Sequence, residues 1–315
     1  MLINHLPKIK VVGIGGSGVN AVTRMHKENI SNIELIAVNT DAQVLKNCPV
    51  AKKILIGKKI TGGFGAGMDM QLGEKAAKEN YQELKQALEG GQLIFLTCGL
   101  GGGTGSGAIS VLGEIAKLNG ALTIAVVTLP FSFEGAQRKN IAQWVLKKME
   151  NKVDSFLVIP NDRLLKITGP ACTLENAFWL CDGILREAVK GIADLISSPH
   201  IISVDFADLK NILRNSGRAF LGIGRAKGEK RALSAASSAM QSSLLDFSLK
   251  EAEGILLNIA GDEDLSLAEV NMVAAFIKKN AHPQAKIIFG VSQDSGLEKG
   301  ELKVTLIATA RCQAV

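Results

Sequence analysis

The stretch that most constrains this chain is Gly99–Gly107, in which six of nine residues are glycine. An apolar segment of strand length, residues 93–97, precedes it, and residues 108–116 follow it with the apolar spacing of a helix. Because glycine has no Cβ, successive backbone N–H groups can converge on an anion at the start of the helix, where the helix dipole also favours negative charge. The order of strand, glycine loop and helix therefore predicts a phosphate-binding cradle.

The composition of this loop narrows the class of cradle. Thr104 and Ser106 add hydroxyl donors, and no lysine follows in the Walker pattern, which places the loop outside the P-loop class. A branched side chain at Gly105 is predicted to enter the cradle and block the phosphates. A flexible linker is the alternative interpretation, but a linker would not be held between a buried strand and an amphipathic helix.

Length and composition indicate a globular protein with about two domains, because the chain has 315 residues, 47% of them hydrophobic and 21% charged. No apolar run is long enough to cross a bilayer, and the first residues lack a signal-peptide region, so we expect a cytoplasmic protein. The five cysteines and four histidines show no metal-ligand spacing, so no protein-bound metal is expected.

The charge pattern argues against a nucleic-acid groove. The formal net charge is +6, but the basic residues come as dispersed pairs, which are typical of a solvated surface. Aromatic residues make up only 4% of the chain, so stacking platforms for bases are scarce.

A second glycine motif lies near the start of the chain. A strand predicted at 8–12 runs into Gly13-Ile14-Gly15-Gly16-Ser17-Gly18, and a helix is expected from about Val19. The next predicted strand, 34–38, ends in Asn39-Thr40-Asp41, which places an acidic residue where a dinucleotide fold has its ribose-binding carboxylate. These features alone keep an NAD-dependent dehydrogenase open.

A third glycine cluster, residues 61–67, favours a different ligand. Three glycine loops that follow strands of one parallel sheet would meet at its carboxyl edge, which suits a triphosphate held from several sides. A dinucleotide normally needs only the first loop.

Two pairs of polar residues follow later strands at the same edge. After a strand at 122–130, Glu134 could accept hydrogen bonds from ribose hydroxyls and Arg138 could reach phosphate oxygens. A glutamate at a helix start with a surface arginine is an equally good interpretation. A further strand, 154–162, ends in the polar residues Asn161-Asp162 at the same edge.

The apolar spacing of residues 174–198 predicts one long helix, closed by Pro199 and roughly 38 Å long. Phe178 and Asp182 lie four residues apart and share a face, where a ring could stack on a base and a carboxylate could accept from its N–H groups. Phe178 as an ordinary core residue is the alternative.

Beyond the long helix, the chain reads as a second α/β domain without glycine cradles, with strands predicted at 254–259, 285–290 and 303–308. Asp205 and Asp208 stand at the entrance of a helix expected at 209–213. Acidic residues at this place often only cap the helix and complement its dipole.

Together these residues resemble the FtsZ family, the bacterial cell-division GTPases of the tubulin superfamily, from about Lys8 to Ala310. The most specific match is Gly101–Gly107, which agrees with the tubulin form of the glycine motif. Further matches, in the family's order and spacing, are residues 39–43, 130–135, 159–162 and 204–208.

The resemblance implies an α/β fold of the tubulin type: a Rossmann-type GTP-binding domain at 1–173, a long central helix at 174–199 and a smaller α/β activation domain at 200–315. It implies a GTPase whose subunits polymerise head to tail into filaments of the division ring. GTP or GDP would be the nucleotide, with Mg²⁺ held mainly by the phosphates. Implied partners are other copies of the chain and other division proteins, at the cytoplasmic division site, with no nucleic acid and no direct membrane insertion.

The resemblance also implies roles for residues. Asp205 and Asp208, on the acidic loop of one subunit, would complete the site of the next subunit and polarise the attacking water. The long helix would place Asp208 far from its own chain's nucleotide. The residues implied to bind GTP are Gly15, Gly16, Ser17, Asn20, Asn39, Asp41, Gly65, Ala66, Gly67, Gly101, Gly102, Gly103, Thr104, Gly105, Ser106, Gly107, Glu134, Arg138, Asn161, Phe178 and Asp182.

The sequence departs from the family pattern at named positions. Ser203 replaces an asparagine of the acidic loop, Cys181 replaces the asparagine before the base-reading aspartate, and Asp69-Met70 replaces Asn-Pro. The chain is also basic, whereas the family is typically acidic. Because of Ser203, a GTP-binding scaffold that assembles but barely hydrolyses GTP stays open.

Overall fold

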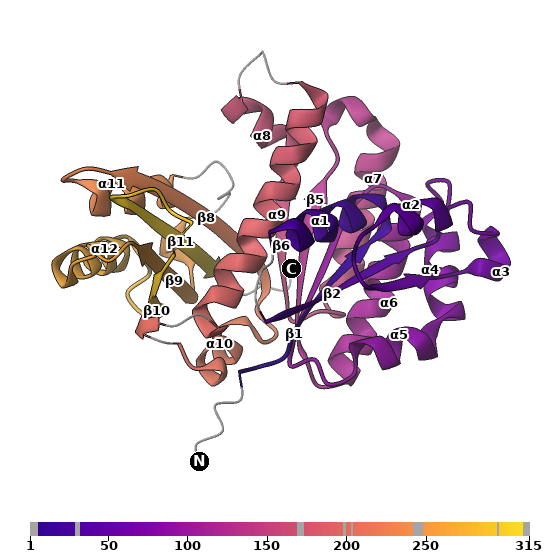
Figure 1. Ribbon diagram of the computed structural model, residues 1–315, viewed down its shortest axis with the longest axis horizontal. Coiled ribbons are helices and arrows are strands. Elements are labelled where there is room, and N and C mark those ends of the chain that lie inside the picture. The colour runs from indigo at the N-terminus through magenta and orange to yellow at the C-terminus, as the bar shows by residue number, and fades with distance from the viewer. Residues whose placement is uncertain are drawn as a thin grey trace. The chain divides into compact units, whose positions relative to one another are not determined.

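The computed structural model describes residues 6–28, 32–168, 173–197, 200–202, 204–241, 248–294 and 296–310. The chain divides into two compact units, the first formed by Pro7–Val189 and the second beginning at Lys190 (Figure 1). Helix α9 (Leu174–Ser197) contributes residues 174–189 to the first unit and the rest to the second.

The first unit is built on a parallel sheet with the strand order β3-β2-β1-β4-β5-β6. Its strands are β1 (Ile9–Ile14), β2 (Ile33–Asn39), β3 (Lys52–Leu55), β4 (Leu93–Gly99), β5 (Leu122–Leu129) and β6 (Ser155–Pro160). Every residue of β1 is buried, as expected where helices cover both faces of a parallel sheet. The strand order reverses between β1 and β4, and ligands of α/β proteins bind at such a switch point.

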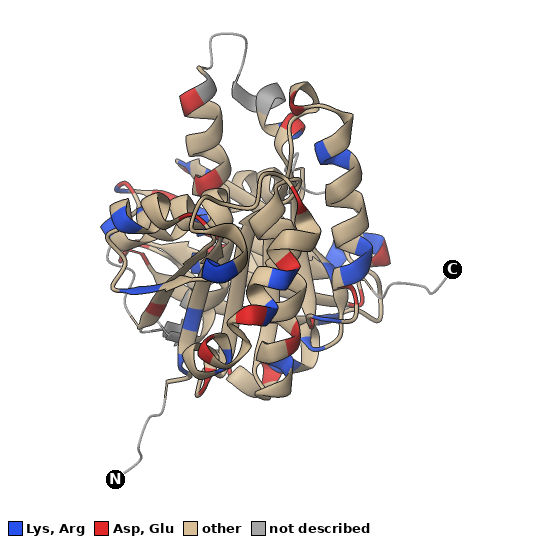
Figure 2. Ribbon diagram, turned by 90° about the vertical axis from the view of Figure 1, so that its right-hand side faces the viewer, with Lys and Arg blue, Asp and Glu red and all other residues tan. Residues whose placement is uncertain are grey.

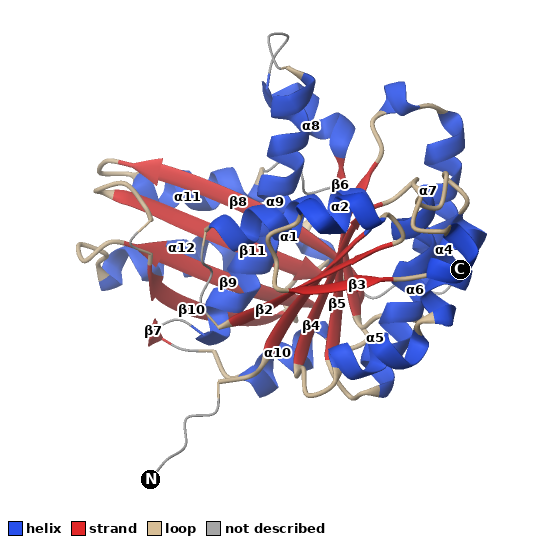
Figure 3. Ribbon diagram, turned by 45° about the vertical axis from the view of Figure 1, so that its right-hand side comes forward, coloured by secondary structure: helices blue, strands red, loops and turns tan. Residues whose placement is uncertain are grey.

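Helices of the first unit follow its strands and pack against them. They are α1 (Gly15–Lys27), α2 (Ala42–Asn47), α3 (Lys58–Thr61), α4 (Met70–Glu79), α5 (Tyr81–Leu88), α6 (Gly103–Leu118), the 3₁₀ helix η1 (Ser132–Glu134), α7 (Ala136–Met149) and α8 (Asn161–Thr168). Figure 3 shows α4, α5 and α6 grouped beside the strands, and these three helices contact one another.

Helix α6 differs from the amphipathic helix that its sequence predicts. It is buried on nearly all sides, because α4, α5 and α7 cover it. It also begins earlier than expected, at Gly103, so that much of the glycine motif is its first turn rather than a loop. Helix α1 likewise begins at Gly15 rather than near Val19.

The third glycine cluster does not directly follow a strand, contrary to the prediction. It follows α3, and it pairs with the end of β2 through a bridge between Asp41 and Phe64. The backbone N–H of Gly65 also donates to Thr40 O at 3.3 Å. This pairing still brings the cluster to the carboxyl edge of the sheet.

The second unit has a mixed sheet with the order β8-β11-β9-β10-β7, as a second α/β domain requires. Strand β11 is antiparallel to both its neighbours, and β9 and β10 are parallel. The elements are β7 (His200–Ile202), α10 (Phe206–Leu213), β8 (Gly217–Lys227), α11 (Arg231–Met240), the 3₁₀ helix η2 (Leu249–Glu251), β9 (Gly254–Gly261), α12 (Leu267–Asn280), β10 (Lys286–Gln293) and β11 (Glu301–Thr309).

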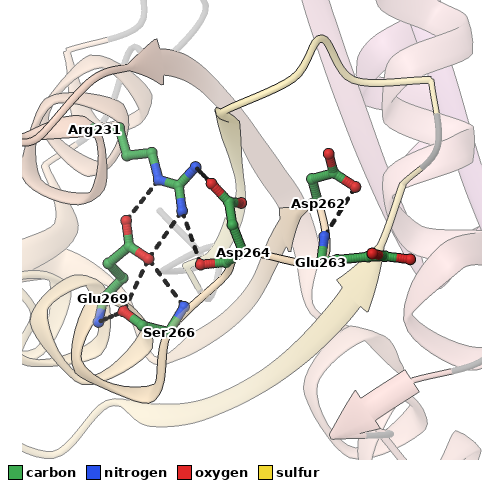
Figure 4. Close-up of polar contacts among 6 residues, drawn as sticks. All are labelled: Arg231, Asp262, Glu263, Asp264, Ser266 and Glu269. Carbon is green, nitrogen blue, oxygen red and sulfur yellow. Dashed lines mark hydrogen bonds and ion pairs between the residues drawn. The ribbon is translucent and has the colours of Figure 1, made fainter.

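A buried arginine joins the starts of α11 and α12 (Figure 4). Arg231 donates from Nε to Glu269 Oε1 at 2.6 Å and from Nη1 to Asp264 Oδ2 at 2.8 Å. Glu269 also forms a capping box with Ser266 at the start of α12. The hydrogen bonds from Arg231 hold the pKa of Glu269 down at about 2.

Charged side chains of both signs are interspersed on the ribbon (Figure 2). Lys78 and Lys148 both pair with Glu74, and Lys152 pairs with Glu114. Within the described part of the chain, no helix combines the length and the apolar character that crossing a bilayer demands.

Candidate nucleotide-binding site

A cavity of about 270 Å³ opens at the carboxyl ends of β1, β4 and β5. The starts of α1 and α6, the segment after β5 and one face of α9 enclose it. The residues that line it are Ile14, Gly15, Gly16, Ser17, Gly99, Leu100, Gly102, Gly103, Thr104, Gly105, Thr128, Pro130, Glu134, Arg138, Asn161, Phe178, Cys181 and Asp182. Residues from three separate parts of the predicted site, the two glycine motifs and the Phe178–Asp182 face, thus meet in one cavity.

Two helix N-termini point at this cavity without side-chain caps. Neither Ile14, before α1, nor Gly102, before α6, accepts a capping hydrogen bond with its side chain, and neither first turn contains an acidic residue. The first N–H groups of a helix lack intrahelical partners and carry partial positive charge. The cavity therefore offers an anion two sets of backbone donors.

The glycines of this cradle have different tasks. A Cβ at Gly15, whose φ is +71°, would lie 2.9 Å from the backbone N of Gly105, so the two helix starts can come this close because Gly15 lacks a side chain. A Cβ at Gly105 would lie 3.1 Å from Cys98 Cβ and from Gly99 O. A side chain at Gly105 would therefore first meet the protein's own backbone at the ends of β1 and β4, and the prediction that it also blocks the phosphates stays a prediction.

Gly16 and Gly102 are the positions where a side chain would find open space. Both line the cavity, and no atom lies within 4 Å of a Cβ built at either. Gly102 has φ −92° and ψ 173°, a conformation that any residue can adopt. A side chain there would crowd a ligand without straining the fold.

Other residues of the glycine motif shape the cradle from behind. Ser106 Oγ accepts from the backbone N–H of Gly101 at 2.9 Å, and Thr104 Oγ1 lies 2.6 Å from Thr40 Oγ1. A Cβ at Gly107 would lie 2.2 Å from Met70 O, so this glycine lets α4 pack on α6. Gly101, Ser106 and Gly107 do not line the cavity.

Several other residues of the predicted site also lie outside the cavity lining. Asn39 Oδ1 accepts from the N–H of Thr40 at 2.8 Å, and Asp41 caps α2 by accepting from Gln43 N and Val44 N. Ala66 instead covers the start of α6, since a Cβ at Gly103 would lie 2.9 Å from Ala66 Cβ. Residues not brought to the cavity wall are Asn20, which is exposed on α1, Asn39, Asp41, Gly65, Ala66 and Gly67.

Glu134 and Arg138 line the cavity as a bonded pair. Glu134 Oε2 lies 2.7 Å from Arg138 Nη1, and Glu134 Oε1 accepts from the N–H of Phe131 at 2.9 Å. The local helix-start role and the position on the cavity wall, which seemed to be alternatives, therefore coexist.

Two residues with buried acceptors, Asn161 and Asp182, also line the cavity. Asp182 is 6% exposed and its Oδ2 lies 2.8 Å from Arg24 Nη1. Burial raises the pKa of Asp182 to about 6, and Arg24 opposes that rise. Asn161, 4% exposed, has an Oδ1 atom with no hydrogen-bond partner among the described residues.

Two more side chains of α9, Phe178 and Cys181, line the cavity. Phe178 is 40% exposed, which leaves part of its ring free to stack on a planar ligand. Burial raises the pKa of the Cys181 thiol to about 12, so this group is neutral near pH 7 and unsuited to be a nucleophile. A planar base with N–H donors would satisfy the acceptors here.

The acidic pair Asp205 and Asp208 belongs to the second unit. Asp205 caps α10 by accepting from Ala207 N at 3.3 Å, and Asp208 lies in the first turn of the same helix. Asp208 is half exposed, with Lys286 Nζ 3.7 Å from its Oδ1. Ser203, which motivated the scaffold hypothesis, lies outside the described residues.

A parallel sheet with two uncapped helix N-termini at its switch point, and buried acceptors in the same cavity, defines a nucleotide-binding protein of the α/β class. Residues 8–169 match the Tubulin/FtsZ family, GTPase domain, and residues 217–311 match the FtsZ family, C-terminal domain. The chain therefore belongs to the FtsZ family of GTPases. Membership of this family excludes the NAD-dependent dehydrogenase that the first glycine motif alone had left open.

Similar proteins agree with this assignment. The "Cell division protein FtsZ 1" of Pyrococcus abyssi and that of Pyrococcus furiosus are each 45% identical over 302 residues, 96% of this chain and 80% of theirs. The solved "FtsZ dimer, empty" of M. jannaschii is 45% identical with a TM-score of 0.94, covering 98% of this chain and 90% of that one. CetZ1 from Haloferax volcanii, 23% identical with a TM-score of 0.80 over 96% of this chain and 93% of that one, shares the fold.

Proposed function

We propose that this chain binds and hydrolyses GTP, assembles head to tail into filaments that act in cell division, and completes each GTP site with Asp205 and Asp208 of the adjacent subunit. The observation that carries the nucleotide assignment is that the unpartnered, buried Oδ1 of Asn161 and the buried carboxylate of Asp182 belong to residues that line the same cavity as the glycine cradle.

Guanine fits the Asn161 and Asp182 acceptors better than adenine does. Guanine presents an N1–H and a 2-amino group on one edge, and a carboxylate can accept from both, whereas adenine lacks that pair of donors. Asn161 Oδ1 provides a further acceptor, and the exposed part of Phe178 can stack on the base.

The triphosphate fits the cradle end, where α1 and α6 present uncapped N–H groups. The two carboxylates that line the cavity, Glu134 and Asp182, both pair with arginines. A Mg²⁺ ion would therefore be held mainly by phosphate oxygens, where it would neutralise part of their charge.

The same pairing explains why a further carboxylate is needed for hydrolysis. Neither Glu134 nor Asp182 is free to orient a water molecule toward the terminal phosphate. The half-exposed Asp208 and the neighbouring Asp205 can do so from another copy of the chain. The solved M. jannaschii relative described as an FtsZ dimer supports self-association.

Phosphate release and pelleting with GTP test this function together. The wild-type chain should pellet with GTP and release phosphate, whereas Asp208→Ala should bind GTP with unchanged affinity and release phosphate at least about a hundredfold more slowly. Glu263→Ala, which removes an exposed acid elsewhere in the second unit, is the matched control and should match wild type.

Two outcomes would change the assignment. A wild-type chain that pellets with GTP without releasing phosphate would be the assembling scaffold rather than the GTPase. An Asp208→Ala chain with full turnover would show that the acidic loop does not complete the site.

A further inference from the structure

A second cavity, of about 280 Å³, lies in the first unit beside the nucleotide cavity. The segment after β5, helix α7 and the start of α8 enclose it. Its wall is mainly apolar, with Leu129, Pro130, Phe131, Ala136, Ala142 and Pro160 among the lining residues. The nucleotide function proposed above makes no use of this cavity.

The charges around this second cavity are unbalanced. Asp162 lines it, but Asp162 Oδ1 accepts from Ser132 N at 2.8 Å and Oδ2 accepts from Ser132 Oγ at 2.5 Å, so both oxygens are engaged. Lys139 also lines it, and its exposed ammonium group has no ion pair or hydrogen bond with the described residues. An uncompensated cation thus stands beside an apolar wall.

This second cavity and the nucleotide cavity share parts of their walls. Pro130 and Asn161 line both. Phe131 lines the second cavity, and its ring packs edge-on against Phe178 with centroids 5.5 Å apart. The N–H of Phe131 also donates to Glu134, which lines the nucleotide cavity. Any group that fixes Phe131 therefore acts on two residues of the nucleotide site.

We propose that the second cavity is a regulatory site for a small amphipathic anion, a molecule with an apolar ring body and one carboxylate or sulfonate group. The ring body would pack against Pro130 and Ala136, directly over the buried Phe131, and the anionic group would pair with Lys139. The occupant would hold the segment 130–135 in place from outside the nucleotide cavity. It would thereby raise nucleotide affinity, because less freedom remains to be lost when GTP or GDP binds.

The effect on nucleotide affinity rests on the proposed function, but binding in the second cavity does not. Coupling between two sites is reciprocal, so the nucleotide should raise affinity for the anion by the same factor. Factors of about 5 to 150 are typical of coupled sites.

The probe is 1-anilinonaphthalene-8-sulfonate, which joins an aromatic body to one sulfonate. We expect saturable fluorescence with one dye per full-length chain when GDP already saturates the nucleotide cavity. Ala136→Phe, at an exposed position of the wall, should fill the second cavity and abolish the signal. Lys139→Gln should weaken binding about tenfold by removing the charge-assisted contact. Lys147→Gln, exposed on the same helix but not on the wall, is the control and should not weaken it.

Thermal unfolding checks that each variant is folded, and Gln143→Trp offers a second way to fill the cavity from an exposed wall position. No saturable signal, or a signal unchanged in Ala136→Phe, Gln143→Trp and Lys139→Gln, would overturn the site. GDP affinity measured calorimetrically with and without dye tests the coupling, and equal values would overturn it. GDP binding without dye reports separately on the proposed nucleotide site.

Discussion

At the scale of single residues, Asp182 stands out, because burying a charged carboxylate costs free energy of folding. Its pKa of about 6 lies above the value of about 3.9 for an unperturbed Asp, and burial is the main cause. Between these two values the folded chain binds more protons than the unfolded chain. The free energy of unfolding of the nucleotide-free chain should therefore fall as pH rises from about 4 to about 6, and then stay level as far as Asp182 is concerned.

A first prediction follows for stability without nucleotide. Asp182→Asn should raise the free energy of unfolding at pH 7.5 by up to about 3 kcal/mol, because the amide carries no charge to bury. The gain should shrink to about 0.5 kcal/mol near pH 4, where Asp182 is protonated in the folded chain and about half protonated in the unfolded chain. Urea unfolding at both pH values measures this, and a gain of the same size at pH 4 would contradict it.

A second prediction concerns the base. GTP affinity should exceed ATP affinity at pH 7.5 and should fall as pH drops below about 6, because a protonated carboxyl offers one acceptor fewer. Each charge-assisted hydrogen bond lost costs about 1.5–3 kcal/mol. Calorimetric titration at several pH values measures the affinities, with Asp182→Asn as the control for titration of the phosphates themselves. Equal affinities for GTP and ATP would rule out the guanine assignment.

At the scale of elements, we expect different glycines at the start of α6 to serve nucleotide binding and packing of the fold. Gly102→Val should lower GTP affinity at least about tenfold and leave the melting temperature within a few degrees, since Gly102 has open space and an ordinary φ. Gly105→Val should instead lower the melting temperature, because its side chain meets Cys98 and Gly99. Calorimetry and thermal unfolding of both variants test this, and the reverse pattern would show that the two roles are exchanged.

The same elements show what sequence patterns can and cannot predict. Strands β1, β2, β4, β5 and β6 were predictable, because buried parallel strands are short apolar runs. The starts of α1 and α6 were not predictable. Both lie in glycine-rich stretches, and glycine has no side chain that could contribute to the apolar spacing by which a helix is recognised. Strand β8 was not predicted either, because Gly222 and Gly224 interrupt its apolar pattern. Glycine at position 224 lets α11 pack closely on β8, because a Cβ there would lie 2.0 Å from Ala235 O of α11.

Site residues were predictable where chemistry and position coincide, as for Asn161, Phe178 and Asp182 on the cavity wall. Other predicted polar groups lie off the cavity wall and bond to nearby backbone. Asp41 occupies the place of a ribose-binding carboxylate, and its side chain accepts hydrogen bonds from the N–H groups of Gln43 and Val44 in the first turn of α2, so its role toward a nucleotide stays a prediction. Arg24, the partner of Asp182, was not predicted, because a basic residue in the last turn of a helix is also what the helix dipole favours.

At the scale of the whole molecule, the nucleotide cavity lies within residues 14–182 and the acidic pair belongs to the second unit. If Asp208 acts on an adjacent copy, turnover per subunit should rise with protein concentration. A mixture of Asp208→Ala with Gly102→Val should also regain turnover, because an intact cradle on one variant can meet intact carboxylates on the other. Phosphate release from the mixture and from each variant alone measures this. Turnover independent of concentration, without rescue on mixing, would place the complete site in one chain.

The burial of Arg231 has a consequence for how the chain responds to salt. Dissolved ions weaken the attraction between exposed charges, and the Debye length shortens as salt rises, from about 10 Å at 0.1 M to about 3 Å at 1 M. Contacts such as Lys78–Glu74, whose lysine side chain is 62% exposed, should therefore weaken in concentrated salt. Arg231 is 8% exposed and its partner Glu269 is 16% exposed, which keeps most counterions at a distance. Rising ionic strength should therefore loosen the surface of the first unit around α4 well before it frees α11 from α12. At high salt concentration, α11 and α12 of the second unit should therefore stay joined through Arg231.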